Sequence, residues 1–307
     1  MLDSPASDSP PRVGIAPDSW GVWNPQDPVQ PPPRQYLREV QQAGYHLTEL
    51  GPFGYLGTDV SRLADDLSAH DLKLTGGTVF TGLHRVSVDE AWSAVSEVAR
   101  LVKGLGAKHM IVIPELWQRG DTGHVDGSRT FSAAQWDRFL TGHDELGRRL
   151  LEEFGLHQQF HSHAESPVGT WTEVTRLLEG TDPQYTNLCL DTGHFAYYLG
   201  DTLSLIQAHP DRIGYLHLKQ VDPALLPDVL KNDVDFATAV QRGIMIEPPY
   251  GTPAFAPILA EAAKSTPGIF AVVEQDLYPV ANFEVPLPIA RRTLEHITSC
   301  GAPVRLR

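Results

Sequence analysis

Short apolar runs that stop at an ionisable side chain recur along this chain, and they constrain its fold more than any other feature. The runs at 187–194, 213–219 and 270–276 carry Asp191, His217 and Glu274, and a fourth run at 156–163 ends in His161 and His163. Buried parallel strands have this continuous apolar character, and in barrels they present functional side chains at their C-terminal ends. The pattern therefore predicts parallel strands whose ends meet at one rim.

Segments typical of strands and helices alternate along the rest of the chain. We predict strands over 12–17, 45–50, 72–80, 108–114, 156–163, 187–194, 213–219 and 270–276, and helices over 34–43, 59–70, 88–105, 132–154, 170–180, 202–209 and 286–299. Eight strand-helix units in 307 residues favour an α/β protein with a closed (β/α)8 TIM barrel, which needs about 250 residues plus insertions. The chain has no Gly-x-Gly-x-x-Gly and no Walker pattern that would favour a doubly wound sheet.

Composition and charge indicate where the protein works and which classes of partner it can bind. Residues 1–11, rich in Ser, Pro and Asp, predict a disordered leader before a single barrel domain over 12–307. The chain has neither an apolar run near ~18 residues nor a signal peptide, so we expect a cytoplasmic protein. Its net charge of −14 disfavours nucleic acid and anionic membranes as partners. Cys189 and Cys300 are the only cysteines, so no disulfide framework or thiolate metal cluster is expected.

Carboxylate and imidazole groups gathered from separate strands suit a divalent metal that polarises a carbonyl. Asp191, His217 and Glu274 are the predicted ligands, although Asp is also a common helix N-cap and a lone buried His is often structural. The fourth ligand is open among His161, His163 and Glu165. We assign His161 to the metal and His163 to proton abstraction, because a free imidazole is a natural general base.

Other rim positions are predicted to contact substrate. His194 and Lys219 are placed to contact substrate oxygens or to stabilise an enediolate, and we group Lys219 and Glu274 with His163 as catalytic. The remaining candidate substrate contacts are Trp20, Glu49, Thr78, Glu115 and Glu247. Tryptophans in the loop after the first strand could form an apolar platform for a sugar ring or pack the barrel mouth. The long loop that ends at Ser132 is typical of a lid or binding loop, and the segment 236–251 ends in a turn-rich stretch, 243–251, that is placed to fold over the rim.

These features resemble the xylose-isomerase-like barrel superfamily of sugar phosphate isomerases and epimerases, and within it the inosose dehydratase group of myo-inositol catabolism. The resemblance rests on residues 14–21 (Gly-Ile-Ala-Pro-Asp-Ser-Trp-Gly), 48–51, 191–194, 217–219, 236–251 and 273–276. It implies Mn, Co, Mg or Zn held by His161, Asp191, His217 and Glu274. In most of the superfamily a glutamate stands at the position of His161, with a histidine two residues later. In related dehydroshikimate dehydratases that histidine, equivalent to His163, resembles the base that removes the proton next to the carbonyl.

The leading hypothesis is a metal-dependent lyase that removes water from a keto-cyclitol or keto-sugar such as 2-keto-myo-inositol through an enediolate. A sugar isomerase or epimerase would use the same enediolate. A catalytically inactive sugar-binding protein would use the site for binding alone. The expected partner is a small sugar or cyclitol, and a homo-oligomer is compatible with the sequence. The absence of a run of arginines mildly favours an unphosphorylated polyol.

Overall fold

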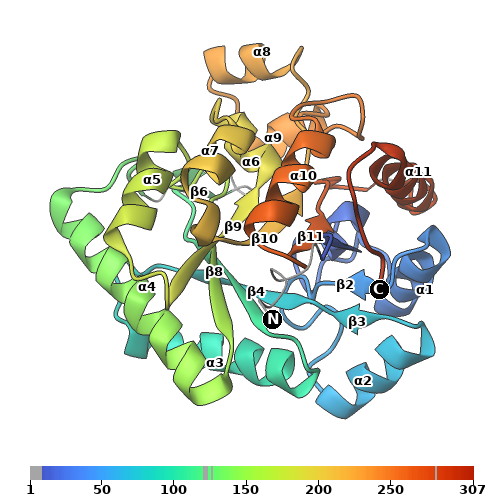
Figure 1. Cartoon of the computed structure of the whole chain (residues 1–307), viewed down its shortest axis with the longest axis horizontal. Coiled ribbons are helices and arrows are strands. Elements are labelled where there is room, and N and C mark those ends of the chain that lie inside the picture. Colours follow the sequence, from blue (N-terminus) through green and yellow to red (C-terminus); the bar gives the residue numbers. More distant parts are fainter. Residues whose placement is uncertain (1–8, 120–123, 126, 281) are drawn as a thin grey trace, which may run out of the picture.

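A ring of parallel strands surrounded by helices forms the body of the protein (Figure 1), as a computed structural model describes it for residues 9–119, 124–125, 127–280 and 282–307. The strands of the ring are β1 (Arg12–Ile15), β2 (Leu47–Thr48), β3 (Lys73–Leu74), β4 (Gly76–Thr81), β5 (His109–Pro114), β8 (His157–His161), β9 (Thr186–Asp191), β10 (Ile213–Leu218) and β11 (Phe270–Val273). They lie in the order β3-β2-β1-β11-β10-β9-β8-β5-β4. A separate antiparallel pair is formed by β6 (Gln118–Arg119) and β7 (His124–Val125).

The ring closes through the segment predicted as the third strand, 72–80. In the structure this segment bends at Thr75, so that β3 pairs with β2 while β4 pairs with β5. The Thr75 N–H donates to the Thr48 carbonyl at 2.9 Å, and the Leu50 N–H donates to the Gly76 carbonyl at 3.1 Å. Two glycines follow Thr75, and glycine within a strand commonly marks a bend. The two short strands therefore share one barrel position, and the predicted (β/α)8 barrel is confirmed.

Helices cover the outside of the ring. They are α1 (Pro33–Ala43), α2 (Val60–Ala69), α3 (Val88–Gly104), α4 (Ala133–Phe154), α5 (Trp171–Gly180), α6 (Thr192–Tyr197), α7 (Thr202–Ala208), α8 (Leu226–Lys231), α9 (Phe236–Gln241), α10 (Phe255–Ser265) and α11 (Pro286–Ser299). The apolar stripe predicted for α3 is buried, with Val95, Val98 and Val102 each at most 2% exposed. Ser87 and Glu90 form a capping box that fixes where this helix begins.

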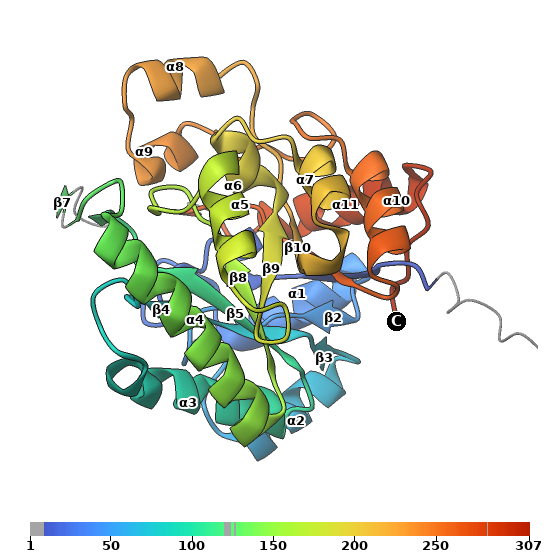
Figure 2. The same cartoon turned by 60° about the vertical axis from the view of Figure 1, so that its left-hand side comes forward.

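Most strands are shorter than predicted. The strand expected over 187–194 ends at Asp191, and Thr192 begins α6, because Asp191 caps that helix. The stretch 236–251 begins with the short helix α9, and the turn-rich part expected over 243–251 follows it. Figures 1 and 2 show α8 and α9 standing out from the ring of helices, so the chain between β10 and β11 makes an excursion before α10 covers the barrel.

The N-terminal end of the described chain is tied to the barrel. The Gly268 N–H donates to the Ser9 carbonyl at 2.7 Å, and the Arg305 N–H donates to the Pro11 carbonyl at 2.8 Å. Ordered backbone therefore begins before Arg12, whereas residues 1–8 of the predicted leader lie outside the described residues. Among the described residues, none of the helices combines the length and apolar character needed to span a bilayer.

Candidate active site

Four side chains from consecutive strands converge at the C-terminal rim of the barrel. His161, Asp191 and His217 lie at the ends of β8, β9 and β10, and Glu274 directly follows β11. Each of the four offers a nitrogen or oxygen atom, and these atoms all lie within 4.8 Å of one another. His161 Nε2 is 3.4 Å from Asp191 Oδ2, and His217 Nδ1 is 2.8 Å from Glu274 Oε2. The predicted ligand set is thus brought together around one point.

The donor atoms in this group fit a divalent cation. Both ring nitrogens of His161, Asp191 Oδ2 and His217 Nδ1 are buried, and none has a hydrogen-bond partner with acceptable geometry among the described residues. Buried polar atoms without partners are rare, because each costs roughly 1–3 kcal/mol. Two imidazoles and two carboxylates are suitable ligands for zinc, cobalt or manganese. Of the alternatives left open by the sequence, His163 and Glu165 are not in this group.

Asp191 has two roles, which the sequence presented as alternatives. Its Oδ1 accepts the N–H groups of Gly193 and His194 at 2.9 and 2.8 Å and so caps α6, while Oδ2 faces the other ligands. Asp191 is fully buried. The glycine two residues later is needed for close packing, because a Cβ on Gly193 would lie 2.5 Å from Lys219 Cγ.

Lys219 places a buried ammonium beside the ligand group. Its Nζ lies 2.8 Å from Asp276 Oδ2, 3.2 Å from Glu274 Oε2 and 3.3 Å from Asp191 Oδ2. Burial by itself would raise the pKa of Asp191, but the Lys219 charge and the neighbouring histidines together outweigh it and hold that pKa well below its usual range. Burial also opposes the charge of Lys219, yet these carboxylates raise the pKa of the ammonium well above its ordinary value. Both groups are therefore charged at neutral pH.

Glu49 contacts His217 and is not exposed at the rim of the barrel. Its Oε1 lies 2.7 Å from His217 Nε2, and both side chains are 1% exposed. Thr78 Oγ1 donates to Glu49 Oε2 at 3.5 Å. A carboxylate on the outer nitrogen of a metal-binding histidine fixes the tautomer and the ring orientation. Glu49 therefore leaves Nδ1 of His217 free to face the other ligands.

His163 and His194 form a second imidazole pair next to the ligands. Their ring centroids lie 3.9 Å apart, and the His161 and His163 centroids lie 5.9 Å apart. His163 Nδ1 donates to the Ala164 carbonyl at 2.7 Å, so the neutral ring keeps Nε2 as an acceptor. Burial, with the charges of His161 and Lys219, lowers the pKa of His163 to about 3. Its neutral form is therefore the resident one, although its basicity is low.

Three rim predictions are not brought to this centre. The Trp20 indole is fully buried and donates to Glu39 Oε2 at 2.8 Å, so it packs the core and does not form a platform. Glu115 pairs with Arg85 at 2.5 Å, and Glu247 pairs with Arg292 at 2.6 Å. Both carboxylates are thus held by an arginine, and ion pairs near the surface of a protein are common.

The structure adds residues that the sequence did not single out. Asp276 forms an ion pair with Lys219, and it stands two residues after Glu274 in the segment predicted as strand, so alternation within that segment could have indicated it. Asp18 lies 4.0 Å from Lys219 Nζ. Phe236, the first residue of α9, packs its ring 5.4 Å from that of His163 and 5.2 Å from that of His194. No local pattern in the sequence links Phe236 to these histidines.

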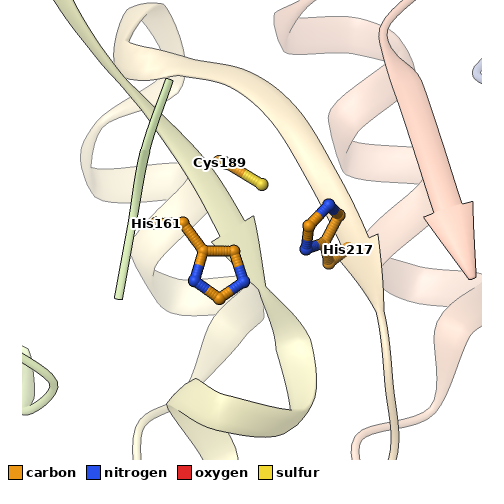
Figure 3. A group of neighbouring side chains, drawn as sticks. All are labelled: His161, Cys189 and His217. Carbon is orange, nitrogen blue, oxygen red and sulfur yellow. The ribbon is translucent and has the colours of Figure 1, made fainter. Parts of the chain in front are cut away.

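Cys189 lies deeper in the barrel than the ligand carboxylates. Its side chain is fully buried, and Figure 3 shows the sulfur between the rings of His161 and His217. These three residues also offer nitrogen and sulfur atoms within 4.8 Å of one another. Burial raises the pKa of the Cys189 thiol to about 12, so the thiol is protonated at neutral pH.

Comparisons with known proteins agree with this fold. The chain is 29% identical to the inosose dehydratase of Geobacillus kaustophilus over 308 aligned residues, covering 94% of each protein. It is 30% identical to the rhizopine catabolism protein MocC of Rhizobium meliloti, covering 96% of this chain and 90% of that protein. The solved structure of the IolI protein with a bound zinc atom superposes with a TM-score of 0.70 at 15% identity, covering 94% of this chain and 98% of that one.

The family comparison extends over most of the barrel. Residues 37–298 match the family described as the xylose isomerase-like TIM barrel. The match includes the strands that carry His161, Asp191, His217 and Glu274. The resemblance inferred from the strand ends is therefore confirmed, and the chain belongs to the xylose isomerase-like TIM barrel family.

Proposed function

We propose that this protein is a metal-dependent dehydratase that removes water from a keto-cyclitol or keto-sugar such as 2-keto-myo-inositol. The observation that carries the proposal is the convergence of four candidate ligand side chains, three of them buried, beside a neutral histidine that keeps Nε2 as an acceptor. The inosose dehydratase of Geobacillus kaustophilus, similar along nearly its full length, supports the choice of reaction.

His161, Asp191, His217 and Glu274 would hold the cation, and the cation would supply Lewis-acid polarisation of the substrate ketone. The balance of two imidazoles and two carboxylates favours manganese, cobalt or zinc over magnesium. Glu274 is the most exposed of the four side chains at 16%, compared with at most 1% for the other three. The substrate would therefore approach past Glu274.

The side chains around the cation position divide the remaining work. His163 Nε2 would take the proton next to the ketone, and the electrons of that C–H bond would form an enediolate. The Lys219 ammonium would stabilise the negative charge that develops on the substrate oxygens. The hydroxyl group on the neighbouring carbon would then leave, and the proton held by His163 would depart with it as water.

Incubating metal-loaded protein with 2-keto-myo-inositol tests the proposal. Dehydration predicts a growing enone-type ultraviolet absorbance. Its formation should stop when the protein is chelated and resume when the metal is restored. Exchange of the substrate proton with solvent without that absorbance would instead identify an isomerase or epimerase. Tight sugar binding with neither signal would identify a binding protein.

A further inference from the structure

We propose that Cys189, with His161 and His217, forms a second ligand set that holds a thiophilic dication such as cadmium, zinc or cobalt. This set lies below the carboxylates and shares both imidazoles with the rim centre. The two sets are therefore alternatives, and one cation at a time can use the histidines. The inference does not depend on which reaction the rim centre catalyses.

The strand register stacks the two sets. On β9 the side chains of Cys189 and Asp191 point to the same face of the strand, because they are two residues apart. Cys189 pairs in register with His161 on β8, whereas Asp191 pairs with His217 on β10. The thiol thus lies one layer below the carboxylate. Figure 3 shows it next to both imidazoles.

The surroundings of the thiol suit a metal ligand. Cys189 is fully buried, and both ring nitrogens of His161 are buried without a hydrogen-bond partner among the described residues. A nitrogen–sulfur set selects soft or borderline cations, while the carboxylates above favour harder ones. Two neutral imidazoles and a thiolate leave one positive charge on a bound dication, and Asp191 and Glu274 lie close enough to balance it.

Binding requires one chemical step. The S–H bond of Cys189 breaks as a sulfur–metal bond forms, and the proton is released to solvent. The competing interpretation is that Cys189 simply fills space, because it packs with Ile111, Tyr215 and Val272 in an apolar cluster inside the barrel. A space-filling thiol would make no bond to a metal, so a spectrum of the metal–sulfur bond separates the two interpretations.

The experiment is a titration of the metal-free full chain with cobalt(II), followed by ultraviolet and visible absorption and by metal content. Cys300 is half-buried and lies outside the barrel interior, so Cys300→Ala is the matched control for Cys189→Ala. We expect a sulfur-to-cobalt charge-transfer band in the wild type and in Cys300→Ala, and its loss in Cys189→Ala. Cadmium affinity should fall at least about tenfold in Cys189→Ala, while manganese affinity should stay unchanged.

Cobalt bound at one ion per chain without a charge-transfer band in Cys300→Ala would overturn the proposal, since that variant retains Cys189 as its single thiol. This outcome decides the question even if Cys189→Ala fails to fold. Equal loss of manganese and cadmium affinity in a folded Cys189→Ala would also overturn it, because that result would reflect general loosening of the barrel. Neither outcome bears on dehydration, which is measured separately with manganese-loaded protein.

Discussion

The two halves of the barrel rim use similar residues differently. Strands β8 to β11 end in His161, Asp191, His217 and Glu274, which turn inward to one point. Strands β1 to β5 also end near polar or aromatic candidates, but Trp20 is buried beside Glu39 and Glu115 is paired with Arg85. Glu49 is the exception, because it reaches across to His217. A strand-end position is therefore insufficient to define a site, and the direction of the side chain and its nearest opposite charge decide its role.

Replacing a ligand should have the largest effect. Asp191→Asn keeps an oxygen that can cap α6, but it removes the charge that faces the histidines. We expect dication affinity to fall more than about 100-fold, together with loss of turnover. Asp201→Asn is the matched control, because Asp201 caps α7 from an exposed position. Isothermal titration of both variants tests the contrast, and equal affinities would remove Asp191 from the ligand set.

The next largest effect is expected at the proposed base. His163→Ala should keep the metal but lower turnover about 10²- to 10⁴-fold. His143 provides a comparison, because it is also fully buried but packs against Phe139 and Phe160 outside the rim. His143→Gln should lose stability and keep turnover per folded molecule. Wild-type turnover in His163→Ala would show that another group removes the proton.

Glu49 tests whether a residue of the β1–β5 half of the rim supports the metal centre or contacts the substrate. Glu49→Gln should lower metal affinity about 10- to 100-fold by loosening the orientation of His217, with little change in the Km for substrate. Glu39→Gln changes a buried carboxylate of the same half that contacts Trp20, so it should affect stability alone. A raised Km with unchanged metal affinity in Glu49→Gln would restore Glu49 to the role of substrate contact.

Glu165 tests how much stability the protein loses by burying a carboxylate outside the ligand group. Burial outweighs the hydrogen bond from the Phe236 N–H and raises the pKa of Glu165 from 4.5 to about 7. The folded state then binds more protons than the unfolded state between about pH 4.5 and 7, so this group lowers stability as pH rises through that window. Relative to wild type, Glu165→Gln should gain at most about 2 kcal/mol between pH 5 and 8. Thermal denaturation at both pH values measures this, and a gain independent of pH would contradict the assignment.

The smallest effect is expected at the outward-facing pairs. Glu115→Gln breaks the exposed contact with Arg85 and should cost at most about 1 kcal/mol without affecting turnover. A kinetic defect in Glu115→Gln at saturating metal would mean that the N-terminal half of the rim contacts substrate more widely than its ion pairs indicate. The readout is the initial rate of enone formation.

The sequence predicted the barrel and the ligand strands because these depend on local patterns. Apolar runs that end at His161, Asp191, His217 and Glu274 encode the strands and place the four candidate ligands at their ends. The contacts of Trp20 with Glu39 and of Glu115 with Arg85 could not be predicted, because tertiary packing sets them. The contact of Phe236 with His163 arises from the excursion of α8 and α9, whose path no local signal specifies.

The most direct test of the central claim is anomalous X-ray diffraction from crystals soaked in manganese(II), which favours carboxylate and imidazole ligands over a thiol. We predict one peak within bonding distance of a nitrogen of His161 and of His217 and an oxygen of Asp191 and of Glu274. A manganese ion bound elsewhere, or a peak that lacks contact with Asp191 and both histidines, would contradict the claim that these side chains form the metal centre.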